Sequence, residues 1–68
     1  MVNTLKLKGR MREMDLTQST CAERMGIRAP TFNQKLNNIR AFSLQQAEEL
    51  AKMLEIKDSE FGDYFFCK

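Results

Sequence analysis

Residues 16–38, LTQSTCAERMGIRAPTFNQKLNN, decide the fold of this chain. Thr17 can cap the start of a helix, and Gly26 stands where that helix should end, because glycine readily takes the left-handed conformation of a helix C-terminus. Pro30 suits the first turn of a second helix, where its missing N–H is not needed. We expect this second helix to run to about Asn37. The stretch therefore predicts two helices of about eight residues joined by a turn of three or four residues.

The exposed face of the second helix follows from its buried face. Phe32 and Leu36 are four residues apart and should point into the core as a pair. The side chains left to face outwards or to flank the contact are Thr31, Asn33, Gln34, Lys35 and Asn37. They carry amide, hydroxyl and ammonium groups, which can meet base edges and backbone phosphates. The stretch therefore predicts a helix-turn-helix motif in which residues 29–37 enter the major groove of DNA.

The rest of the chain has the residue patterns that begin and continue helices, and it lacks the alternating pattern of a strand. Apolar residues recur at helical spacing over about residues 5–14 and predict a first helix. Ser43, followed three residues later by Gln46, is the capping-box pattern that opens a fourth helix. The apolar stripe expected on the inward side of that helix is Leu44, Ala47, Leu50, Ala51 and Leu54.

The tail of the chain, residues 58–68, predicts a short fifth helix that closes the core. It has acidic residues early and the aromatic residues Phe61, Tyr64, Phe65 and Phe66 late. These aromatic side chains are expected either in the core or at a contact between two copies of the chain. The sequence thus predicts an all-α fold, a compact four- to five-helix bundle with a central helix-turn-helix, in a single domain over residues 1–68.

Basic and acidic residues are segregated along the chain, although its net charge is only +2. Residues 1–47 contain eight basic and three acidic side chains, whereas residues 48–68 contain three basic and six acidic ones. No acidic residue lies between Arg24 and Ala47. A polyanion such as a nucleic acid should therefore meet the first two-thirds of the chain and avoid the last third.

Composition argues against other classes of function. The chain has no histidine, and its two cysteines, Cys21 and Cys67, lie far apart in the sequence, so we expect no metal site and no cofactor. Without histidine the commonest general base is missing, and no glycine-rich phosphate loop occurs, so we expect neither an enzyme nor a small-molecule substrate. The longest aromatic run is far too short to cross a membrane. Reduced cysteines fit a cytoplasmic location in a bacterial cell.

Three parts of the deciding stretch resemble the helix-turn-helix of the Cro/repressor family, also called the xenobiotic-response-element family. They are Leu16-Thr17-Gln18, Ala22-Glu23-Arg24-Met25-Gly26-Ile27 and Thr31-Phe32. The resemblance covers about residues 5–56 and implies a lambda-repressor-like DNA-binding domain. Residues 31–37, Phe42 and the closing Tyr64-Phe65-Phe66 are similar to a small prophage-encoded subgroup of the family.

The resemblance also implies roles for individual residues. Gln18, at the start of the first helix of the motif, would bond a backbone phosphate, and Asn37 would lie near the backbone. The base-reading positions would fall on Ala29, Pro30, Asn33 and Gln34. Ala29 and Pro30 replace the polar residues often found there, so their readout could only be apolar, for instance against a thymine methyl group. The usual glycine after this helix is Asn38, which tolerates a left-handed conformation.

We therefore expect a transcriptional regulator that binds double-stranded DNA in a sequence-specific way. The residues expected to contact DNA are Gln18, Arg28, Ala29, Pro30, Thr31, Asn33, Gln34, Lys35, Asn37, Asn38 and Arg40. One domain of this size would contact few base pairs, so we expect a homodimer on a pseudo-palindromic operator. The alternatives are an antirepressor or an antitoxin, a protein-interaction module on the same fold. Lys35, with Arg28 and Arg40 alongside, favours DNA.

Overall fold

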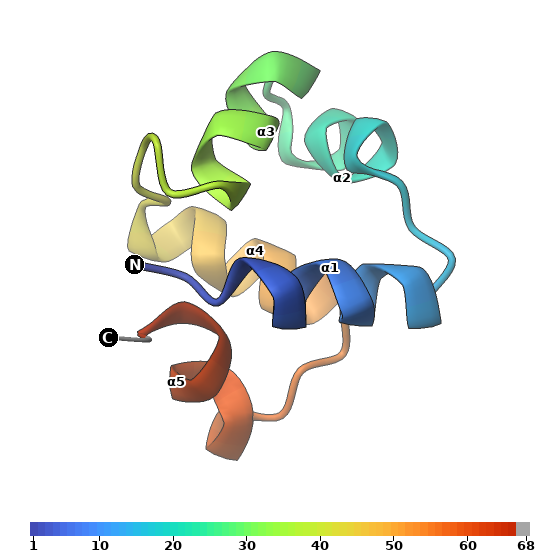
Figure 1. The fold of residues 1–68 in the computed structure, drawn as a ribbon. Coiled ribbons are helices and arrows are strands. Elements are labelled where there is room, and N and C mark those ends of the chain that lie inside the picture. Colours follow the sequence, from blue (N-terminus) through green and yellow to red (C-terminus); the bar gives the residue numbers. More distant parts are fainter. Residues whose placement is uncertain (67–68) are drawn as a thin grey trace.

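The computed structural model describes residues 1–66, which form five helices around one core (Figure 1). The helices are α1 (Thr4–Glu13), α2 (Gln18–Met25), α3 (Ala29–Leu36), α4 (Leu44–Met53) and α5 (Asp58–Phe65). Residues 1–66 contain no strand, so the prediction of an all-α fold is confirmed. Figure 1 shows α2 and α3 together at one end of the molecule, α1 and α4 in the middle and α5 at the opposite end. None of these helices is long and apolar enough to cross a membrane.

Local side-chain chemistry sets where three of the helices begin. The side-chain oxygens of Asn3, Thr17 and Ser43 accept hydrogen bonds from backbone N–H groups in the first turns of α1, α2 and α4. At α4 the Ser43 N–H also donates to the Gln46 side chain at 3.1 Å, which completes the capping box. The caps predicted at Thr17 and Ser43 are confirmed. Asn3 is an additional cap, and it places α1 one residue earlier than the apolar spacing predicts.

Four of the helices end in the same way. A residue with left-handed backbone follows each of them, with φ between 52° and 70°, and the N–H of the next residue bonds to a carbonyl five positions earlier. The left-handed residues are Asp15, Gly26, Asn38 and Glu55. An apolar residue comes next in each case, and Ile39 is the one of these four that is not packed against the core. The stop at Gly26 and the left-handed Asn38 are thus both confirmed.

The core connects α3 to α5 through a series of aromatic contacts. Phe32 and Leu36 are fully buried, as predicted. The ring of Phe32 packs edge-to-face on that of Phe42, with centroids 5.9 Å apart, and Phe42 packs in the same way on Phe65 at 6.3 Å. Phe65 then stacks on Phe61 at 4.7 Å. Phe42, in the loop before α4, therefore couples the position of α3 to the last helix.

The prediction that Leu44 belongs to the buried stripe of α4 is wrong. Its side chain is 63 % exposed, whereas the other four residues of the stripe are buried. Leu44 is the first residue of α4, and it lies on the rim of a surface hollow that Phe42 and Phe65 also line. Phe42 packs between the rings of Phe32 and Phe65, so an aromatic residue of the loop fills the core at this end of α4.

The aromatic residues of the tail divide between core and surface. Tyr64 and Phe65 are buried, whereas Phe66 is 66 % exposed. Cys67 and Lys68 lie outside the described residues. The predicted fifth helix is confirmed, and of the aromatic residues in the tail Phe66 is the exposed one.

Asn38 ties the N-terminal segment to the end of α3. Its side-chain oxygen accepts from the Val2 N–H at 2.8 Å, and its side-chain nitrogen donates to the Val2 carbonyl at 3.0 Å. The Thr4 hydroxyl donates to the Leu36 carbonyl at 2.7 Å. These hydrogen bonds hold the start of α1 against the C-terminal end of α3.

Candidate nucleic-acid interface

A connection of three residues, Gly26, Ile27 and Arg28, holds α3 against α2. Gly26 turns the chain with a left-handed backbone (φ 70°), and Ile27 packs against the core. Arg28 precedes the first turn of α3 in an extended conformation, and Pro30 lies within that turn. Because Phe32 and Leu36 anchor one side of α3 in the core, the opposite side of the helix is open to solvent.

The open side of α3 carries small and amide side chains. Ala29, Pro30, Asn33 and Asn37 are exposed. Thr31, Gln34 and Lys35 are partly buried along its two flanks. The structure thus brings together on one helix all the residues predicted to contact bases, with Asn33 at the centre of the exposed side and Gln34 beside it.

A hydrogen bond joins the first residue of α2 to the middle of α3. The Asn33 side-chain nitrogen donates to the Gln18 side-chain oxygen at 3.0 Å. Each amide keeps hydrogen-bonding capacity after this bond: Gln18 retains the two N–H donors of its nitrogen, and Asn33 retains its oxygen and one N–H. The bond therefore orients both amides without removing their ability to bind a further partner.

Three other predicted residues have partners within the protein. The Lys35 ammonium donates to the Ala41 carbonyl at 2.9 Å, so it is directed towards the loop after α3. The Asn37 side chain donates to the Asn33 carbonyl at 2.8 Å, within α3 itself. Both ends of the Asn38 amide are engaged by Val2, so this side chain holds the N-terminal segment in place.

The basic and acidic residues that are separated along the sequence are also separated in the folded molecule. Arg28 and Arg40 are exposed just before and shortly after α3, and neither forms an ion pair within residues 1–66. The acidic residues of α5 lie at the opposite end of the molecule from α2 and α3 (Figure 1). A polyanion approaching the side of α3 therefore meets cations and amides before it meets a cluster of carboxylates.

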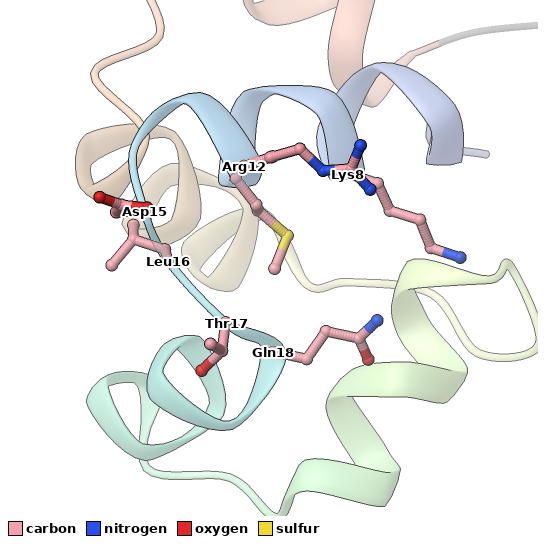
Figure 2. A pocket seen from close by; sticks show the side chains of 7 residues that line it. Lys8, Arg12, Asp15, Leu16, Thr17 and Gln18 are labelled. Carbon is pink, nitrogen blue, oxygen red and sulfur yellow. The ribbon is translucent and has the colours of Figure 1, made fainter.

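Two basic residues of α1 that sequence reasoning did not single out also lie near the start of α2. Lys8 and Arg12 line a surface hollow of about 420 Å³ together with Gln18, as Figure 2 shows. The other residues that line it are Met11, Asp15, Leu16 and Thr17. The signal in the sequence was the spacing of four between Lys8 and Arg12, which puts both on one side of a helix.

The buried cysteine has no sign of a reactive role. Burial raises the pKa of the Cys21 thiol, and the nearby positive charge of Arg24 opposes this effect only in part. The neutral thiol is thus favoured, and Cys21 acts as a small core residue. In the part of the chain that the structure describes, no group of three or more cysteine, aspartate or glutamate residues is placed to hold a metal ion.

Comparison with known proteins adds no assignment to this geometry. No family model matches the chain, and no curated protein matches it in sequence.

Proposed function

We propose that this chain is a sequence-specific DNA-binding protein and a transcriptional regulator, with α2 and α3 as a helix-turn-helix and α3 in the major groove. The observation that carries the proposal is the open side of α3, where Asn33 is exposed with Gln34 on the flank beside it, between two exposed arginines, Arg28 and Arg40. A helix of eight residues is about 12 Å long. The major groove is about 12 Å wide, and an α-helix with its side chains is about 10–12 Å in diameter, so the groove can admit α3.

Some residues of the interface would bind backbone phosphates and so position the protein on DNA, and others would read the base sequence. Asn33 and Gln34 carry the donor and acceptor pairs that can bind adenine with two hydrogen bonds. Arg28 and Arg40 would neutralise phosphates on the strands that border the groove, and the amide nitrogen of Gln18 would donate to a phosphate at the start of α2. The Gln18–Asn33 hydrogen bond supports this division, because it fixes a phosphate-binding amide relative to a base-reading one.

The size of the molecule supports binding as a homodimer. Its longest dimension is 28 Å, whereas successive major grooves on one side of B-DNA are about 34 Å apart. One copy therefore reaches one groove, and two copies in contact can place two α3 helices in successive grooves. Leu44 and Phe66 are largely exposed and line one surface hollow, and we call these two residues the apolar edge. This edge is the surface we propose for the contact between copies.

Removing the apolar edge should weaken assembly and leave the monomer folded. We expect the double variant L44S/F66S to keep its melting temperature, because both side chains are largely exposed. Its affinity for a duplex with two half-sites should fall towards that for a single half-site, since the contact that couples the two copies is lost. The variant Gln45→Ser is the matched control, a polar residue next to Leu44. Equal cooperativity in the double variant and the control would exclude this edge as the contact.

Replacing Arg40 by alanine should weaken binding to every DNA sequence to a similar extent. Arg40 is exposed and forms no ion pair within the described residues, so the fold should be unaffected. The slope of log affinity against log salt concentration should become shallower by about one unit per subunit, because one phosphate contact is lost. Fluorescence anisotropy with cognate and random duplexes at several salt concentrations measures both effects.

Lys52→Ala is the control for Arg40→Ala, since it removes one positive charge from α4. It should leave the salt slope unchanged. If Arg40→Ala instead abolished discrimination between cognate and random DNA while leaving the salt slope intact, Arg40 would be a base-reading residue and this part of the proposal would be wrong.

A further inference from the structure

The four basic residues of α1 fall into two pairs with different surroundings. Lys6 lies over the ring of Tyr64, with its nitrogen 4.9 Å from the ring centre. Arg10 donates to the Leu54 carbonyl at 2.7 Å and forms an ion pair with Glu13 at 3.3 Å. These two cations serve the fold. The side chains of Lys8 and Arg12 are both exposed, and neither makes a hydrogen bond or ion pair with the rest of residues 1–66.

The unpaired cations, Lys8 and Arg12, share one hollow with Gln18. Figure 2 shows Lys8 extending from α1 towards the side of α3, above the amide of Gln18, while Asp15 lies at the other end of the hollow. Asp15 is the one acidic residue on the rim. The end of the hollow near α3 is therefore lined by donors, the ammonium of Lys8 and the amide of Gln18, with the guanidinium of Arg12 alongside.

The orientation of Gln18 adds to the donor character of this end. Its oxygen accepts from Asn33, and its amide nitrogen keeps both N–H donors for a further partner. The side chains supply the charge of the hollow, and the start of α2 adds the positive end of a helix dipole. A ligand that accepts several hydrogen bonds and carries negative charge matches this set of donors.

We infer that this hollow holds a phosphate group of the DNA backbone, with Lys8 and Arg12 as its cationic ligands and Gln18 as a third donor. The inference rests on the proposed function, because the phosphate belongs to the duplex whose groove α3 enters. The hydrogen bond between Gln18 and Asn33 places the hollow beside the open side of α3, so the phosphate is one that borders the same groove. In this arrangement α1 is a second anchor on the DNA, separate from Arg28 and Arg40.

The test compares Lys8→Gln, Arg12→Gln and the double variant with the unmodified full chain on a duplex obtained by selection. Each substitution removes one charge from an exposed side chain, so the melting temperatures should not change. The slope of log affinity against log salt should become shallower by about one unit per subunit for the double variant, which leaves the phosphate without a cation, and by less for each single variant. Lys57→Gln, which removes a charge just before α5, is the matched control and should keep the slope.

Neutral methylphosphonate linkages then locate the contact on the DNA. Introduced one at a time, they should weaken binding of the unmodified chain at several positions. At one position in each half-site, the same linkage should weaken the double variant much less than the unmodified chain, because the two cationic partners of that phosphate are already gone. Such a position supports the inference.

The outcomes separate this inference from the proposed function. If the unmodified chain binds no duplex DNA, the proposed function fails and the phosphate site fails with it. If it binds DNA but the double variant matches it in affinity and salt slope, the site is wrong and the proposed function stands. If every methylphosphonate weakens the double variant as much as the unmodified chain, Lys8 and Arg12 act only through long-range charge, and the site is again wrong.

Discussion

Replacing Phe32 by alanine is expected to unfold the protein at room temperature. Phe32 is fully buried, and its ring packs on Phe42, which in turn packs on Phe65. Truncation of a buried phenylalanine costs about 3–5 kcal/mol through lost burial and the cavity that remains. A domain of this size has only about 3–5 kcal/mol of stability in total. The circular dichroism of Phe32→Ala should therefore lack most of the helical signal.

Asn33→Ala is the neighbouring control in the same helix. Asn33 is exposed, and alanine is the better helix former, so the spectrum and melting temperature should stay close to those of the unmodified chain. Its affinity for DNA should fall. If Phe32→Ala kept a cooperative melt at a similar temperature, the side of α3 that anchors it in the core would have been assigned wrongly, and the exposed side with it.

Replacing Gln34 by alanine is expected to cost binding specificity and little else. Gln34 lies beside the open side of α3, and a glutamine that bonds adenine with two hydrogen bonds contributes about 1–3 kcal/mol of discrimination. Affinity for the cognate duplex should fall by a corresponding factor of about 5–150, while affinity for random DNA should hardly change. Titration of both duplexes under the same salt conditions gives the two numbers.

The matched comparison for Gln34→Ala is Arg40→Ala, which should weaken both duplexes alike. An equal loss on cognate and random DNA for Gln34→Ala would make this residue a phosphate contact. The reading of bases would then have to lie with Asn33 and with apolar contacts from Ala29 and Pro30.

The bounds of the helices were largely predictable because short-range chemistry sets them. Thr17 and Ser43 cap their helices through side chains that bond three residues ahead, and Gly26 and Asn38 end theirs through a left-handed backbone. Such signals lie within one or two turns of the residues they affect. Leu44 shows the limit of this approach. Its spacing fits the stripe of α4, but its side chain is exposed. Phe42, which packs between the rings of Phe32 and Phe65 from distant parts of the chain, fills the core at this end of α4.

Of the candidate site, the exposed side of α3 was predictable from the sequence, whereas the contacts between side chains and the position of α1 beside α2 were not. The pattern of Phe32 and Leu36 was enough to assign the exposed side of α3. The bond between Gln18 and Asn33 and the attachment of Asn38 to Val2 join positions 15 and 36 residues apart. Lys8 and Gln18 line the same hollow because α1 packs next to the start of α2 in the folded chain. These relations depend on tertiary packing, which spacing along the chain does not contain.

Selection of duplex DNA by the full chain from a random library, followed by titration of the selected duplex at two salt concentrations, tests the central claim most directly. We predict one enriched pseudo-palindromic sequence with half-sites about 10 base pairs apart from centre to centre. It should be bound at least about 1,000 times more tightly than random DNA, and less tightly at the higher salt concentration. No enriched sequence, together with an affinity that does not change with salt, would contradict the account that α3 and its flanking cations form a DNA-binding surface.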